Sequence, residues 1–229
     1  MRSGPTVTEV TPVLAAGVGV RRGFAWVLRA ASFRMGSADT GHLAVGIVAS
    51  RAAEATAIVD LLAGQSRPAY GQLRVMGYDM TTPAGRGAVR SRVGVARRSA
   101  KPQPAIRVRG LVEHATRRAG TPPGDRALLA ASILDRLALT PWADVPVRAA
   151  PELIARRARL AAAAVRQPDL LLLDGLLDDL APRDVAALAD AIRDLARDTS
   201  IVAAGRDAAA LALVGGEILT LSQGVIARG

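Results

Sequence analysis

Short apolar runs of strand length alternate with segments of helical periodicity, and this alternation constrains the fold more than any other feature of the chain. The apolar runs lie at residues 13–20, 43–48, 73–76, 93–96, 170–173, 201–204 and 218–221. After the second run, four apolar residues recur at steps of three and four, which predicts a helix that stops at Gly64. Those residues are Ala55, Ile58, Val59 and Leu62.

A second strand–helix–strand unit follows in the C-terminal half of the chain. The run 170–173 leads to a helical pattern after Pro182 and then to the run 201–204, and two short strands are expected around Gln223. Residues 105–165 show no strand pattern and are typical of three or four helices. Such an order predicts an α/β fold with a mostly parallel sheet, in which the single domain 1–229 carries an inserted helical subdomain at 99–165.

Composition excludes several kinds of site. The chain has no cysteine and two histidines, His42 and His114, so neither thiolate chemistry nor a multi-histidine metal centre is available. Lys101 is the sole lysine, and a mechanism that needs a lysine must use it. No apolar run approaches the roughly 20 residues that a membrane-spanning helix requires, and we expect a cytoplasmic protein.

Positive charge is concentrated between residues 86 and 118, where Glu113 is the only acidic residue. Such a basic patch fits nucleic acid, anionic lipid headgroups or an acidic partner. Because the segment lacks aromatic residues on which bases could stack, nucleic acid is the least favoured of these ligands. The candidate docking residues in the patch are Arg92, Arg97, Arg98, Lys101, Arg107 and Arg109.

Three segments resemble the nucleotide-binding subunit of ATP-binding cassette (ABC) transporters. Residues 61–79 look like the segment after that family's phosphate loop, 168–174 like its Walker B strand, and 216–229 like its closing hairpin. The resemblance covers nearly the whole chain. It implies a P-loop NTPase-like fold with N-terminal antiparallel strands, a position at the inner face of the membrane, and a membrane permease or second cassette subunit as partner.

The stretch that matches the phosphate loop, residues 49–56, lacks the groups that a phosphate loop uses. Glycines there let backbone amides cradle phosphates, a lysine reaches the terminal phosphates, and a hydroxyl holds magnesium. In this chain the glycine positions hold Ala49, Ala52 and Glu54, and the lysine position holds Ala55. Only Thr56 keeps the required chemistry.

The resemblance also identifies the other nucleotide-site positions. Asp174 keeps the magnesium-side carboxylate and is the one metal candidate, with Asp178 and Asp179 either joining it or lying in a solvated loop. The catalytic glutamate, the glutamine, the switch histidine and the signature serine and glycines are all replaced. Their positions hold Gly175, Arg98, Arg206 and residues 150–154, respectively.

The missing lysine decides the expected nucleotide affinity. Removing a cation about 4 Å from a phosphate forfeits roughly 4 kcal/mol at an effective dielectric near 20, or about three decades of affinity. Glu54 either occupies the positive end of the helix where a phosphate would lie, or is an exposed first-turn acid. We therefore assign no catalytic residue, and we expect ATP and Mg²⁺ to bind only weakly or within a complex. The vestigial nucleotide-site candidates are Ser50, Arg51, Thr56 and Asp174.

Three functions remain open from the sequence. The first is a non-catalytic cassette subunit that serves as a partner or scaffold for a membrane protein or a second cassette subunit. The second is an ATPase subunit that is active only in a heteromeric complex. The third and least favoured is a basic adaptor that binds nucleic acid through residues 86–118.

Overall fold

The computed structural model describes residues 13–36, 44–98, 106–118 and 120–228, which form two sheets and seven α-helices. The larger sheet has the strand order β10-β9-β3-β8-β7-β6, and its strands β9, β3, β8, β7 and β6 run parallel. Their bounds are β3 Ala44–Ala49, β6 Val93–Arg97, β7 Leu170–Asp174, β8 Ser200–Gly205, β9 Glu217–Ser222 and β10 Val225–Arg228.

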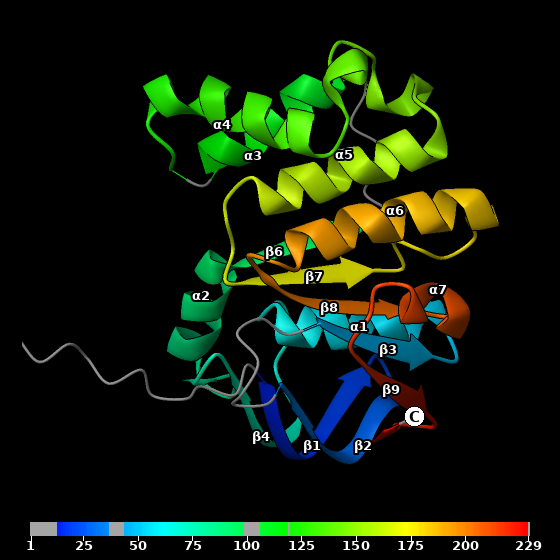
Figure 1. Ribbon diagram of the computed structural model, residues 1–229. Helices are drawn as coiled ribbons and strands as arrows, with labels where there is room; N and C mark the ends of the chain where they lie inside the picture. Colours follow the sequence, from blue (N-terminus) through cyan, green and yellow to red (C-terminus); the bar gives the residue numbers. More distant parts are fainter. Residues whose placement is uncertain (1–12, 37–43, 99–105, 119, 229) are drawn as a thin grey trace, which may run out of the picture.

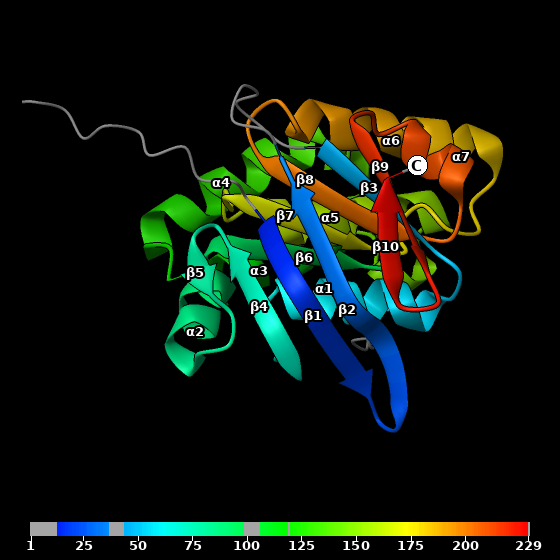
Figure 2. The ribbon, with the colours of Figure 1, turned by 90° about the horizontal axis from the view of Figure 1, so that it is seen from below.

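The smaller sheet is antiparallel and has the order β2-β1-β4-β5. Its strands are β1 Val13–Arg22, β2 Ala25–Met35, β4 Tyr70–Val75 and β5 Tyr78–Asp79. It lies beside the β9–β10 hairpin, and the Arg29 amide of β2 donates a hydrogen bond to the Gly224 carbonyl at 2.8 Å (Figure 2). Strand β2 was not predicted, because shifts in its register with β1 interrupt the alternation of buried and exposed residues.

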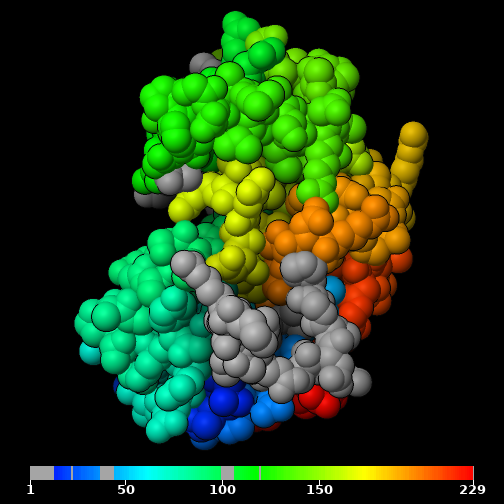
Figure 3. Space-filling model, turned by 60° about the vertical axis from the view of Figure 1, so that its left-hand side comes forward, coloured from blue at the N-terminus to red at the C-terminus, as the bar shows by residue number. Residues whose placement is uncertain are grey.

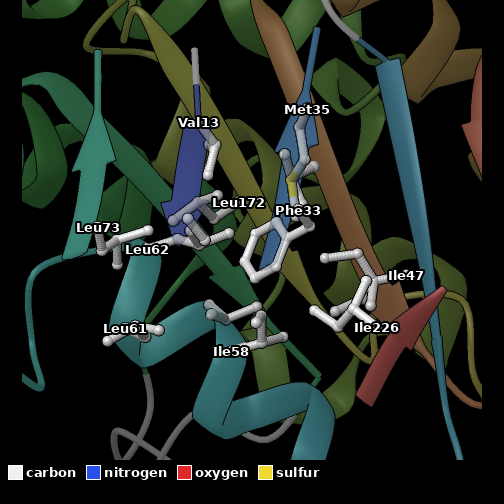
Figure 4. Packing of buried hydrophobic residues seen from close by; sticks show 14 of the residues in the cluster. Val13, Phe33, Met35, Ile47, Ile58, Leu61, Leu62, Leu73, Leu172 and Ile226 are labelled. Atoms are coloured by element: carbon white, nitrogen blue, oxygen red, sulfur yellow. The ribbon is translucent and has the colours of Figure 1, made fainter. Parts of the chain in front are cut away.

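Helix α1 (Ala52–Leu62) lies between the two sheets (Figure 1). Its residues Ile58, Leu61 and Leu62 pack among side chains from both sheets, including Phe33 of β2 and Leu172 of β7 (Figure 4). The opposite face of the parallel sheet is covered by α5 (Glu152–Ala164) and α6 (Pro182–Leu195). The strand and helix positions predicted around α1 and α6 are confirmed.

The apolar run of β7 is explained by its position between these two layers. Leu170 and Leu172 belong to the hydrophobic cluster around α1, whereas Leu171 and Leu173 belong to the cluster on the side of α5 and α6. A central parallel strand that is buried on both faces needs an apolar residue at every position.

The remaining helices are α2 (Pro83–Arg92), α3 (Val108–Arg118), α4 (Pro123–Arg136) and α7 (Ala208–Ala212). Helices α3 and α4 lie together above α5, away from both sheets (Figure 1). The predicted helical character of residues 105–165 is confirmed for the described part of that segment. Helix α2 was not predicted, because its buried residues are only Gly85 and Val89 and the apolar stripe is correspondingly weak.

Candidate functional site

The connection between β3 and α1 consists of Ser50 and Arg51 alone, because α1 begins at Ala52. The amides of Glu54 and Ala55 donate to the Arg51 carbonyl at 2.9 and 3.3 Å, and the Arg51 amide donates to Glu54 Oε2 at 3.1 Å. These three amides are thus used within the chain. A phosphate-binding loop instead leaves such amides pointing at the ligand.

Glu54 is buried, with 3% of its surface exposed, so the expectation of an exposed first-turn acid is wrong. Its Oε1 accepts hydrogen bonds from Nε and Nη2 of Arg51 at 3.1 and 2.6 Å, and its other oxygen accepts the Arg51 amide. The carboxylate therefore caps α1 and lies in the positive end of the helix dipole. The N-terminus of α1 is therefore already occupied by the Glu54 carboxylate.

Thr56 and Asp174 meet at the floor of a pocket of about 280 Å³, at the carboxyl ends of β6 and β7. The Thr56 hydroxyl donates to Asp174 Oδ1 at 3.1 Å. Ser50 and Arg51 do not line this pocket, so the structure brings together two of the four nucleotide-site candidates. The lining residues are Ala52, Ala55, Thr56, Arg97, Arg98, Asp174, Gly175 and Asp178.

Arg97 is one of the two arginines, with Arg98, that line the pocket. It is the register partner of Asp174 on the neighbouring strand, and its Nη1 donates to Asp174 Oδ2 at 2.8 Å. Its Nη2 donates to Asp60 Oδ1 at 2.6 Å and to Gln65 Oε1 at 3.0 Å. Burial raises the pKa of Asp174, while the Thr56 hydrogen bond and the Arg97 charge lower it and offset part of that rise. The guanidinium thus bridges Asp174, which lines the pocket, and Asp60 of α1, and offsets part of their negative charge.

A second charged cluster borders the pocket. Asp179 accepts hydrogen bonds from Arg98 Nη1 and, at 2.7 Å, from Arg206 Nη2, while Asp178 Oδ1 accepts the Arg206 amide at 2.8 Å. Asp178 is buried, with 2% exposed, so its assignment to a solvated loop is wrong. The two arginines stand at the positions that the resemblance assigns to the family's glutamine and histidine.

Asp174, Asp178 and Asp179 do not converge on a common point. Within the described residues, no group of three or more histidine or acidic side chains is arranged to hold a metal ion. Both oxygens of Asp174 accept hydrogen bonds from protein donors, one from Thr56 and one from Arg97. A cation at Asp174 would have to displace the Arg97 guanidinium.

Arg156 is a site residue that sequence reasoning missed. It is buried in α5, with 2% exposed, and its Nη1 donates to the carbonyls of Leu176 and Asp178 at 2.8 and 2.5 Å. It therefore ties α5 to the loop that follows β7. The available signal was an arginine on the alanine-rich face of a helix, four residues after Glu152, with which it also pairs.

The predicted docking residues do not form one unpaired basic surface. Arg92 pairs with Asp169 at 3.1 Å, and Arg107 and Arg109 face Asp144 at 3.9 and 3.3 Å. Arg97 and Arg98 pair with the carboxylates described above, and Lys101 and His42 lie outside the described residues. His114 of α3 is half-buried and lines a cleft. These arginines pair with aspartates that are distant in sequence. The run of basic residues between 86 and 118 therefore predicted more unpaired positive charge than the folded chain has.

No described helix combines the length and apolar character needed to span a membrane.

Comparison with known proteins identifies the fold. No protein-family model and no curated protein matches the sequence. Among solved structures, cbiO1 of Clostridium perfringens, described as part of the ABC transporter complex cbiONQ, superposes with a TM-score of 0.83 at 15% identity, over 96% of this chain and 89% of that chain.

A second solved structure supports the same assignment. The dimeric ABC transporter cassette MJ0796 matches with a TM-score of 0.79 at 14% identity, over 94% of this chain and 97% of that chain. MJ0796 bound to ADP and Pi matches with a TM-score of 0.76 at 15% identity, over the same shares of the two chains. The chain therefore has the P-loop NTPase-like fold of ABC transporter ATP-binding cassettes, as the sequence resemblance predicted.

Proposed function

We propose that this chain is a non-catalytic cassette subunit, a pseudo-ATPase that acts as a partner or scaffold in an ABC transporter-like complex. The observation that carries the proposal is the bridge made by Arg97, whose guanidinium joins Asp174 and Asp60 while Thr56 binds the other oxygen of Asp174. The groups that would hold magnesium are thereby satisfied by the protein.

The phosphate side of the site supports the same proposal. Glu54 caps α1 and accepts the Arg51 amide, so its negative charge lies where phosphate oxygens would approach. Ala55, at the lysine position, is buried with 1% exposed and supplies a methyl group. Binding a triphosphate would require breaking the Arg51–Glu54 contacts, with no lysine to stabilise the added charge.

The fold supports the kind of partner. In their own descriptions, MJ0796 is dimeric and cbiO1 is part of a transporter complex. We therefore propose a membrane permease subunit, a second cassette subunit, or both as partners, at the cytoplasmic face of the membrane. In this proposal residues 99–165 form the inserted helical subdomain.

Titration calorimetry with ATP and Mg²⁺ tests the proposal directly. We expect no binding tighter than about 10 µM, because the absent lysine costs about three decades of affinity. Tighter binding that is lost in Thr56→Val and in Asp174→Asn would place nucleotide in this pocket and contradict the proposal. The same two variants serve as controls for any weaker binding, since binding at another place would survive both substitutions.

An ATPase that acts only in a heteromeric complex is the second candidate, and the retained contact between Thr56 and Asp174 favours it. ATP hydrolysis by a partner cassette, measured with and without this chain, separates the two candidates. Hydrolysis that rises on addition of the chain and falls with Asp174→Asn supports the second candidate. Unchanged hydrolysis supports the scaffold.

A further inference from the structure

A basic concavity shares Arg97 with the nucleotide pocket but is otherwise lined by different residues. It is a cleft of about 580 Å³ bounded by α2, β6, α3 and α5, which falls within the size range of small-molecule sites. Figure 3 shows the surface hollowed between the green helices and the blue-green segment that contains α2. Among the described residues, no aspartate or glutamate lines the cleft. Its charged and titratable lining residues are Arg90, Arg97, Arg118, Arg159, Arg166 and His114.

Within the part of the chain that the structure describes, most of this positive charge is not neutralised by an acidic side chain. Arg97 is paired with Asp60 and Asp174, as described above. Arg90 and Arg166 instead donate to the neutral carbonyls of Gly64 and Ser91, at 3.0 and 3.3 Å. These contacts hold the two side chains in position and leave their charge uncompensated.

Arg118 and Arg159 are the least satisfied members of the set. Arg118 lies in the exposed last turn of α3 and forms no ion pair within the described part of the chain. Arg159 has a buried Nη1 without a hydrogen-bond partner, and its ion-pair partner Glu152 Oε1 is 3.9 Å away. That oxygen already accepts Arg156 Nε at 2.7 Å. A buried guanidinium donor without a partner is costly, and an anion in the cleft would reduce that cost.

The electrostatic environment of Arg159 agrees with this description. Burial lowers the pKa of Arg159, the charge of Arg156 lowers it further, and Glu152 offsets only part of the effect. The helix thus places two neighbouring guanidinium groups against one shared carboxylate. Concave surfaces lined by charge of one sign concentrate counter-ions, and guanidinium groups bind phosphate and carboxylate in a bidentate manner.

We propose that this cleft binds a small polyanion, a ligand with two or more phosphate or carboxylate groups, through Arg118, Arg159 and Arg166. The cleft shares Arg97 with the nucleotide pocket, but Arg118, Arg159 and Arg166 do not line that pocket, and the proposal does not depend on the proposed scaffold function. Apart from the charged groups, most of the lining consists of small apolar residues, so an anion can approach the arginines without competition from acidic side chains.

Titration calorimetry of the full chain with inorganic pyrophosphate and, separately, with citrate at matched ionic strength tests the proposal and distinguishes phosphate from carboxylate. We expect Arg118→Gln and Arg159→Gln each to weaken binding about tenfold or more, because each removes a charge-assisted contact. Arg183→Gln removes the same charge from an exposed position on α6 outside the cleft, and should leave the affinity unchanged. Arg118 is exposed, so its variant should fold even if the variant at the half-buried Arg159 does not.

Four results would overturn the proposal. They are the absence of binding by either anion up to about 5 mM, an equal loss in Arg183→Gln, binding that survives both cleft substitutions, and binding of an acidic peptide without binding of either small anion. Binding abolished by Thr56→Val would instead locate the anion in the nucleotide pocket and would also overturn it. Because the ATP titration reports on Thr56 and this titration on Arg118 and Arg159, failure of one leaves the other standing.

Discussion

At the scale of single residues, the pairing of charges after β6 and β7 decides the chemistry of the pocket. Arg97 and Asp174 stand on adjacent strands in register, and Asp60 reaches the same guanidinium from α1. A buried carboxylate without a cation would be strongly destabilised, so the arginine substitutes structurally for the positive charge that a nucleotide site takes from lysine and magnesium.

The raised pKa of Asp174 predicts a pH dependence of stability. Because the folded state holds this proton more tightly than the unfolded state, the associated stability is full below the unfolded pKa of about 3.8 and is lost as pH rises through the folded value. We expect the free energy of unfolding of the wild type to fall relative to Asp174→Asn as pH rises from about 3.8 through the raised pKa of the folded state. Urea denaturation of both proteins across this range measures the difference, and a difference of opposite slope would contradict the prediction.

At the scale of elements, the close packing of β6 on α5 fixes the floor of the basic cleft. A Cβ added at Gly94 would lie 2.3 Å from the Ala163 carbonyl oxygen, which is part of the α5 backbone. The strand and helix therefore touch through a position that only glycine fits. The register of β6 with β7, not this contact, places Arg97 opposite Asp174.

Substitution of Gly94 tests this contact. We expect Gly94→Ala to destabilise the protein by about 1–3 kcal/mol, since the backbone of α5 must shift to admit the methyl group. Gly110→Ala in α3 is the matched control, because its Cβ would meet Ile106 at an ordinary 3.5 Å. The control should stabilise the protein by up to about 1 kcal/mol through its higher helix propensity. Guanidinium denaturation of the two variants gives both values, and an unchanged midpoint for Gly94→Ala would refute the close packing.

At the scale of the whole molecule, the parallel sheet separates two hydrophobic clusters that share its central strands. One cluster joins α1 to the antiparallel sheet, and the other joins α3, α4, α5 and α6. Because β7 contributes alternate leucines to both clusters, we expect the loss of packing in either cluster to destabilise the whole chain.

Two leucine substitutions test that coupling. Leu172→Ala and Leu173→Ala open cavities on opposite faces of β7, and each should cost about 2–5 kcal/mol. The two tryptophans report on the two sides, Trp26 in β2 and Trp142 beside the helical cluster. With Trp26→Phe or Trp142→Phe as background, fluorescence should give coincident unfolding midpoints for each leucine variant. Separate midpoints would show that the two sides unfold independently.

Much of the fold followed from local patterns. Helices α1 and α6 and five of the parallel-sheet strands were predictable because apolar periodicity depends only on neighbouring residues. Strand β2 was not predicted because its register shifts break the alternation of apolar and polar residues. Helix α2 was not predicted because it buries few apolar side chains. At the site, Thr56 of α1 lies beside Asp174, the last residue of β7, because α1 follows β3 and the carboxyl ends of β3 and β7 lie at the same edge of the sheet.

The sequence by itself determined the order of most strands and helices, the presence of a single lysine and the excess of arginine. Tertiary structure alone decided which arginines are neutralised. Arg97 and Asp174 are 77 residues apart in the sequence and form an ion pair. Arg159 instead lies beside Arg156, and the two arginines share Glu152. Electrostatic energy depends on distance and burial in space, and neither can be read from spacing along the chain.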